Sequence, residues 1–219
     1  MIFTILTTFP RYFESPLESS IIHRAISNHI IDVNLIDLRQ FTNDKHKTTD
    51  DRPFGGGAGM VMKIEPIEKG LASIPMPQPK KNRTILLSAR GNRFVQTDAS
   101  RLATYQSVTL ICGHYGDVDQ RVADYLVDEE ISLGDFVITG GEPAALVIID
   151  AISRLLPNVL GNEASVVAES HAQPGIPSPP SYTRPADYHG WKVPNVLLSG
   201  NAAAIKAWKA DYLDSSDSK

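Results

Sequence analysis

Short apolar stretches alternate with helical patterns along the first 160 residues. Continuous or alternating apolar positions predict strands over residues 2–8, 33–38, 84–88, 108–112 and 131–138. Apolar residues at helical spacing predict helices over residues 64–74, 96–104, 120–126 and 142–156. A further helix is expected to start with Ser15 as its cap and Pro16 at its first position. Strands that alternate with helices predict an α/β domain with a mainly parallel sheet.

The composition changes after this region. Residues 157–194 hold 7 of the 15 prolines, which is typical of a linker and an irregular entry into a second unit. A last helix is predicted over residues 201–213. We therefore expect an α/β domain over residues 1–160, a connecting segment over 161–181 and a small helical domain over 182–219.

The net charge of −4 hides an uneven distribution. Residues 42–93 carry 10 basic and 5 acidic side chains, while the rest of the chain is acidic. The total disfavours a nucleic-acid partner, but the basic segment is compatible either with a solvated loop or with a surface that faces phosphates.

The cysteine content and the lengths of the apolar runs indicate the cellular compartment of the protein. A single cysteine, Cys112, excludes an internal disulfide framework and a cysteine-rich metal site, and it fits a reducing cytoplasm. No apolar run approaches the ~18 residues of a membrane-spanning helix, so no membrane partner is expected. The N-terminal residues are interpreted as a first strand and not as a signal peptide.

A glycine-rich segment follows the second predicted strand. Residues 50–60 read DDRPFGGGAGM, which is neither a dinucleotide fingerprint nor a Walker A loop. Glycine lets a backbone approach a ligand closely, although a flexible hinge would look the same. The neighbouring His46, Lys47 and Arg52 favour a loop that contacts phosphates or bases.

Three predicted strands end in glycine-bearing turns, at residues 88–91, 112–117 and 134–142. Each alone is an ordinary tight turn. Because ligands of open α/β sheets bind at the carboxyl ends of strands, the three together favour one pocket for a nucleotide-like ligand. The histidines His114, His171 and His189 share no ligand spacing, so no metal site is predicted.

Several motifs appear in a fixed order: DKHKTTDDRPFGGGAGM from Asp44, LICGHY from Leu110, SLGDFVITGGE from Ser132, and YTRP with VLLSGN from Tyr182 onward. This combination closely resembles the bacterial tRNA (guanine-N(1)-)-methyltransferase family, over residues 1 to about 209. The resemblance implies a SPOUT-type α/β fold with a C-terminal trefoil knot, followed by a small helical domain that contacts tRNA. It also implies a homodimer with active sites at the subunit interface.

The resemblance further implies methyl transfer from S-adenosylmethionine to ring nitrogen 1 of the guanosine immediately 3′ of the anticodon. Magnesium assistance is also implied, although no ligand spacing for it is visible. The implied donor contacts are Leu86, Leu87, Ser88, Gly113, Tyr115, Leu133, Gly134, Asp135, Phe136, Val137, Ile138, Gly140 and Gly141. The expected tRNA contacts are His46, Asp50, Arg52, Gly55, Gly57 and Gly59.

The family's catalytic pair is an arginine and an aspartate. Arg154 matches the arginine, and Glu169 stands in the place of the aspartate. Taken without the resemblance, Arg154 would be a solvated charge at a helix end and Glu169 a surface acid. The hypothesis is that Glu169 removes the N1 proton as general base while Arg154 stabilises charge on the neighbouring oxygen.

The chain also departs from the family pattern. His114 stands where arginine is usual, Gly116-Asp117 replaces Glu-Gly, and Pro143 replaces an aliphatic residue. The sequence stops soon after the predicted helix 201–213, so we expect a shortened C-terminal domain. These departures leave two alternatives: a catalytically weakened SPOUT protein that binds RNA or donor, and a related methyltransferase for a different RNA.

Overall fold

The computed structural model describes residues 1–75, 81–161, 169–172 and 175–216. The chain divides into two compact units, Met1–Gly161 and Asn162–Lys219. Among the described residues, no helix is both long enough and apolar enough to cross a membrane.

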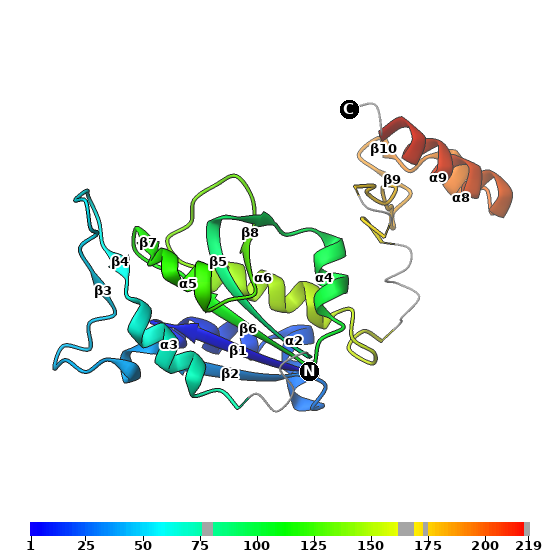
Figure 1. Ribbon diagram of the computed structural model, residues 1–219. Coiled ribbons are helices and arrows are strands. Elements are labelled where there is room, and N and C mark those ends of the chain that lie inside the picture. Colours follow the sequence, from blue (N-terminus) through cyan, green and yellow to red (C-terminus); the bar gives the residue numbers. More distant parts are fainter. Residues whose placement is uncertain (76–80, 162–168, 173–174, 217–219) are drawn as a thin grey trace. The chain divides into compact units, whose positions relative to one another are not determined.

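A five-stranded sheet forms the centre of the first unit (Figure 1). Its strand order is β2-β1-β6-β5-β8, and every pairing is parallel. The predicted α/β fold with a mainly parallel sheet is therefore confirmed, while the trefoil knot stays a prediction. The strands are β1 (Ile2–Thr7), β2 (Asp32–Asp37), β5 (Asn82–Arg93), β6 (Ser107–Cys112) and β8 (Glu129–Ser132).

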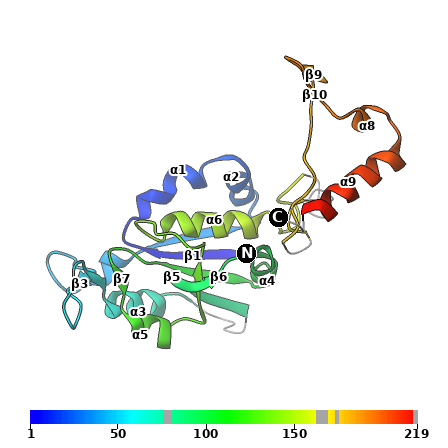
Figure 2. The same ribbon diagram turned by 90° about the horizontal axis from the view of Figure 1, so that it is seen from above.

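Helices cover both faces of this sheet (Figure 2). One face carries α1 (Glu14–Leu17), α2 (Ser20–Ser27) and α6 (Glu142–Ser153), and α4 (Gln96–Leu102) packs against α6. The other face carries α3 (Ile64–Ala72) and α5 (Gln120–Tyr125). Two 3-10 turns, η1 (Pro10–Phe13) and η2 (Leu38–Phe41), follow β1 and β2.

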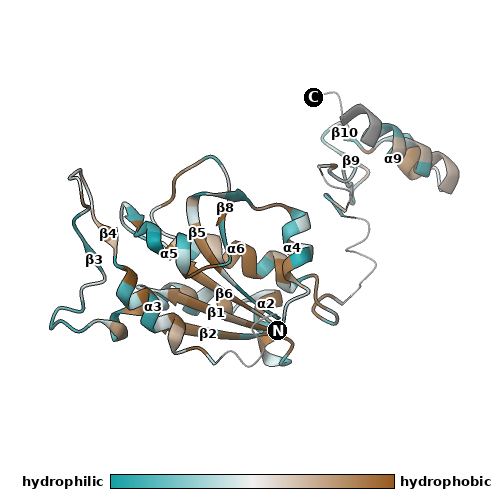
Figure 3. Cartoon of the chain, in the orientation of Figure 1, coloured by the Kyte–Doolittle hydropathy of each residue, from teal (hydrophilic) through white to brown (hydrophobic). Residues whose placement is uncertain are grey.

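The strands divide their side chains between two apolar cores. In β5, Ile85 and Leu87 pack in the core beneath α6, whereas Leu86 between them packs in the core beneath α3 and α5. This is the period of two that a strand requires. The strands β1 and β6 and the helix α6 are accordingly among the most apolar parts of the first unit (Figure 3), as is typical of a parallel sheet that is buried on both faces.

Three element predictions need correction. The helix expected with Ser15 as its cap and Pro16 at its first position is wrong: both residues lie inside α1, which covers Glu14–Leu17, and α2 begins separately at Ser20, whose φ is positive (54°). The strand expected over 131–138 ends at Ser132, because the Ser132 hydroxyl bonds the backbone of Gly134 and turns the chain into a loop. The strand expected over 84–88 is longer and continues past a bulge to Arg93.

The second unit contains a hairpin that the sequence analysis missed. Strands β9 (Asp187–Tyr188) and β10 (Trp191–Lys192) are antiparallel, and they precede α8 (Asn195–Leu198) and α9 (Ala202–Ser216). The turn residues His189 and Gly190 both have positive φ, as a two-residue hairpin turn requires.

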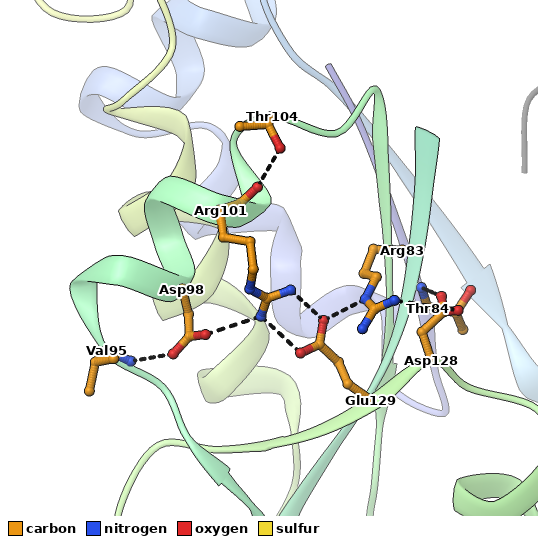
Figure 4. A network of polar contacts seen from close by, with 8 residues as sticks. All are labelled: Arg83, Thr84, Val95, Asp98, Arg101, Thr104, Asp128 and Glu129. Atoms are coloured by element: carbon orange, nitrogen blue, oxygen red, sulfur yellow. Dashed lines mark hydrogen bonds and ion pairs between the residues drawn. The ribbon is translucent and has the colours of Figure 1, made fainter. Parts of the chain in front are cut away.

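A network of ion pairs joins the amino-terminal ends of β5 and β8 (Figure 4). Glu129 accepts hydrogen bonds from Arg83 at 2.7 Å and from Arg101 at 2.8 and 2.9 Å. Arg101 also donates to Asp98 at 3.1 Å. Burial alone would raise the pKa of Glu129, but the hydrogen bonds from Arg101 and Arg83 outweigh it and lower that pKa. The ionised carboxylate is therefore the form that the fold stabilises.

We expect Glu129→Gln to lower the free energy of unfolding by about 2 kcal/mol near neutral pH, because two arginines lose their charged acceptor. Since the folded pKa is lowered, the stabilisation is present above the ordinary glutamate value of 4.5 and disappears as the pH falls through the folded pKa. Urea unfolding of both proteins at neutral and acidic pH measures this difference. The control is Glu68→Gln, because Glu68 is exposed. An equal loss of unfolding free energy in Glu129→Gln at both pH values would show that the charge of Glu129 does not stabilise the fold.

Candidate active site

A cavity of about 210 Å³ opens beside the bulge of β5 and the carboxyl ends of β6 and β8. The three glycine-bearing turns expected to form a pocket all contribute to it, together with the first turn of α6. Its lining residues are Leu87, Ser88, Ala89, Arg90, Gly113, His114, Tyr115, Gly116, Asp117, Val118, Ile131, Ser132, Leu133, Gly134, Phe136, Val137, Ile138, Thr139, Gly140, Gly141 and Ala144. This is the position at which open α/β sheets bind ligands.

Close backbone contacts hold two of these turns together. The Gly141 amide donates to the Gly113 carbonyl at 2.7 Å, and His114 forms an isolated β-bridge with Gly140. A Cβ atom on Gly141 would lie only 2.7 Å from the Cα of Cys112. The glycine at this position therefore lets the loop before α6 rest directly on the end of β6.

A polar cluster lies beneath the cavity. The buried Glu142 accepts a hydrogen bond from the Thr7 hydroxyl at 2.7 Å, and its second oxygen lies 3.7 Å from Nδ1 of His114. The His114 ring packs against Phe9 and Tyr115. These contacts fix the imidazole on one side of the cavity.

The neighbouring Cys112 is a buried thiol. Burial raises its pKa, and the nearby Glu142 carboxylate raises it further. The thiolate is the nucleophilic form of cysteine, so this environment makes Cys112 a packing residue and not a nucleophile.

An ion pair lies at the cavity wall. Arg90, in the bulged part of β5, donates to Asp117 at 2.7 and 3.0 Å in a two-point contact. Asp117 belongs to β7 (Asp117–Val118), which pairs with β4 (Val61–Met62). The pair thereby links the bulged part of β5 to β7, which pairs with the strand that follows the glycine-rich segment.

All of the expected donor residues except Leu86 and Asp135 line the cavity. Leu86 is buried in the core beneath α3 and α5, and Asp135 forms an exposed ion pair with Arg93. The sequence analysis assigned no donor contact to Ala89, Arg90, His114, Asp117 or Thr139, all of which line the cavity. The sequence could have indicated these residues, because each lies in one of the three glycine-bearing segments that were expected to form the pocket.

The glycine-rich segment extends away from the sheet between β3 (Asp50–Asp51) and β4 (Figure 1). Its four glycines have φ values between 79° and 124°, which L side chains rarely adopt. The ring of Phe54 is fully exposed at the start of this glycine run. Of the expected tRNA contacts, Asp50 is partly buried, and His46, Arg52, Gly55, Gly57 and Gly59 are exposed.

The turn before β3 is held by Asp44. Its carboxylate accepts the Thr48 hydroxyl at 2.8 Å and the amides of His46 and Thr48. The Thr48 hydroxyl and amide hydrogen bonds lower the pKa of Asp44. This turn presents the exposed Lys45, His46 and Lys47 to solvent.

The two residues of the expected catalytic pair lie in different units. Arg154 caps the C-terminus of α6 and lines a surface depression with Gln96, Leu146, Val147, Asp150 and Ala151. Glu169 belongs to the second unit and is partly buried. Their pairing therefore stays a prediction. Within the described part of the chain, no group of three or more His, Cys, Asp or Glu residues is arranged to hold a metal ion.

Comparison with known proteins identifies the family of the chain. The family model described as tRNA (Guanine-1)-methyltransferase TrmD matches residues 1–216. The chain belongs to this methyltransferase family. The tRNA (guanine-N(1)-)-methyltransferase of Carboxydothermus hydrogenoformans is 50% identical over 206 residues, which cover 94% of this chain and 79% of that protein.

Two further relatives carry the same name. That of Geobacillus kaustophilus is 48% identical over 205 residues, which cover 94% of this chain and 83% of the relative. That of Dehalococcoides mccartyi strain 195 is 46% identical over 205 residues, which cover 94% of this chain and 82% of the relative. The resemblance seen in the motifs is thus confirmed at the level of the family. The individual site residues remain predictions.

Proposed function

We propose that this protein transfers a methyl group from S-adenosylmethionine to ring nitrogen 1 of the guanosine immediately 3′ of the anticodon, position 37 of tRNA. One observation carries the proposal: a chain of this family forms a cavity from the bulge of β5 and the glycine-bearing turns at the carboxyl ends of the adjacent parallel strands β6 and β8. That arrangement suits a nucleoside-containing methyl donor.

The cavity residues fit such a donor. Leu87, Ile131 and Leu133 provide apolar surface for a purine ring. The glycines at positions 113, 140 and 141 let the turns that line the cavity pack closely on their neighbours, because a Cβ atom there would meet Leu87, His114 or Cys112 respectively. S-adenosylmethionine, when bound, supplies an electrophilic methyl group on its sulfonium sulfur.

The side chains of the protein are proposed to activate the guanine. Ring nitrogen 1 is a poor nucleophile while it carries its proton, so a general base is required. In our proposal the Glu169 carboxylate accepts that proton. Negative charge then develops on the adjacent carbonyl oxygen, and the guanidinium of Arg154 stabilises it. Arginine suits this task because it stays protonated at any physiological pH.

The glycine-rich segment and its approach form the proposed tRNA-contacting surface. Lys45, His46, Lys47 and Arg52 are exposed there and suit phosphate groups. The homodimer with interfacial active sites and the trefoil knot are part of the same proposal.

The test combines the purified protein with methyl-labelled donor and an unmodified tRNA transcript that carries guanosine at position 37. We expect one methyl group per tRNA, recovered as N1-methylguanosine after nuclease digestion. A transcript with adenosine at that position is the matched control and should take up no label. Absence of label from the guanosine transcript, or a methyl group on another atom, would overturn the proposal.

A further inference from the structure

The charges at the cavity wall form a single pair. Among the described residues that line the cavity, Arg90 and Asp117 alone carry a full charge at neutral pH, apart from the titratable His114. They face each other in a two-point contact at 2.7 and 3.0 Å. Their side chains are 53% and 40% exposed, so both remain accessible from the cavity and from solvent.

Both side chains keep unused hydrogen-bonding capacity. Arginine has five N–H donors, of which Arg90 directs two to Asp117. The Asp117 carboxylate offers about four acceptor positions. Three of them receive the two Arg90 donors and the amide of Val118 at 2.8 Å. The pair can thus accept one further cation on the aspartate and one further anion on the arginine.

We propose that this pair binds the amino-acid end of the methyl donor. The guanidinium of Arg90 would hold its carboxylate, and the Asp117 carboxylate would hold its ammonium group. This inference rests on the proposed function, since it assumes that the cavity binds S-adenosylmethionine. Hydrogen bonds between ionised partners are stronger than neutral ones, which favours this assignment over the uncharged parts of the wall.

The rest of the lining supports this orientation. Leu87, Ile131 and Leu133 suit the uncharged adenosine and offer no partner to a zwitterion. Asp117 lies in β7 beside β4, and the amide of its neighbour Gly116 donates to the Met60 carbonyl at 2.9 Å. The amino-acid end is therefore held next to the end of the glycine-rich segment.

The test compares two ligands by isothermal titration calorimetry. S-adenosylhomocysteine contains the amino-acid end, whereas 5′-methylthioadenosine keeps the adenosine and the thioether but lacks that end. We expect Arg90→Gln and Asp117→Asn each to weaken S-adenosylhomocysteine binding by about tenfold. Binding of 5′-methylthioadenosine should stay within about twofold, which also shows that the cavity is intact.

Arg11→Gln is the matched control, because Arg11 pairs with Glu14 outside the cavity lining and its loss should change the binding of neither ligand. If Arg90→Gln and Asp117→Asn weaken both ligands equally, or change neither, the pair has a structural role only and the inference is overturned. If the unaltered protein binds neither ligand, the donor cavity of the proposed function is wrong as well.

Discussion

Replacing Arg154 by alanine is expected to lower the turnover of methyl transfer by about 100- to 1,000-fold, the usual effect of removing one group that stabilises developing negative charge. Donor affinity should change by about twofold or less, because Arg154 is not among the residues that line the donor cavity. The reason is chemical: loss of the N1 proton leaves charge on the guanine carbonyl oxygen, and alanine cannot offset it.

Single-turnover measurements with saturating donor and tRNA separate this effect from binding. Arg24→Ala removes an exposed arginine from α2, on the same face of the sheet, and serves as the matched control. Arg154→Lys keeps the positive charge but loses the planar guanidinium group. Its turnover should therefore fall between those of Arg154→Ala and Arg24→Ala. Unchanged turnover in Arg154→Ala would remove Arg154 from the mechanism.

The sheet and its cavity were predictable because they follow from the strand pattern. The segments after residues 88, 112 and 132 lie at the same edge once the strands pair in parallel, although the first of them is a bulge within β5 and not a turn after it. The apolar runs that predict these strands are local in sequence. The end of β8 was harder to predict from the sequence, because it depends on hydrogen bonds between the Ser132 hydroxyl and the Gly134 backbone.

Contacts between residues that are far apart in the sequence could not be predicted from the pattern of apolar and polar positions. Arg90 and Asp117 are 27 positions apart, and each alone looks like a surface charge in a turn. Leu86 shows the opposite case. It belongs to a strand that borders the cavity, but the alternation of side chains directs it into the core on the other face. A resemblance between sequences, taken residue by residue, does not show to which face of the sheet a side chain points.

A single methyl group on Gly141 should disturb both stability and donor binding. The added Cβ of Gly141→Ala would lie 2.7 Å from the Cα of Cys112 and 3.0 Å from the amide nitrogen of Gly113. Both are backbone atoms that cannot rotate away, so the loop before α6 has to move off the end of β6. Overpacking of this kind costs about 1–3 kcal/mol, and we expect the melting temperature to fall by several degrees.

The same displacement widens the cavity between the turns at Gly113 and Gly140, so S-adenosylhomocysteine should bind at least about tenfold more weakly to Gly141→Ala. Gly161→Ala is the matched control, because a Cβ at Gly161 meets no atom within 4 Å. Thermal unfolding and calorimetry on the three proteins give both quantities. Normal donor binding in a destabilised Gly141→Ala would mean that the contact between loop and strand supports the fold without shaping the donor cavity.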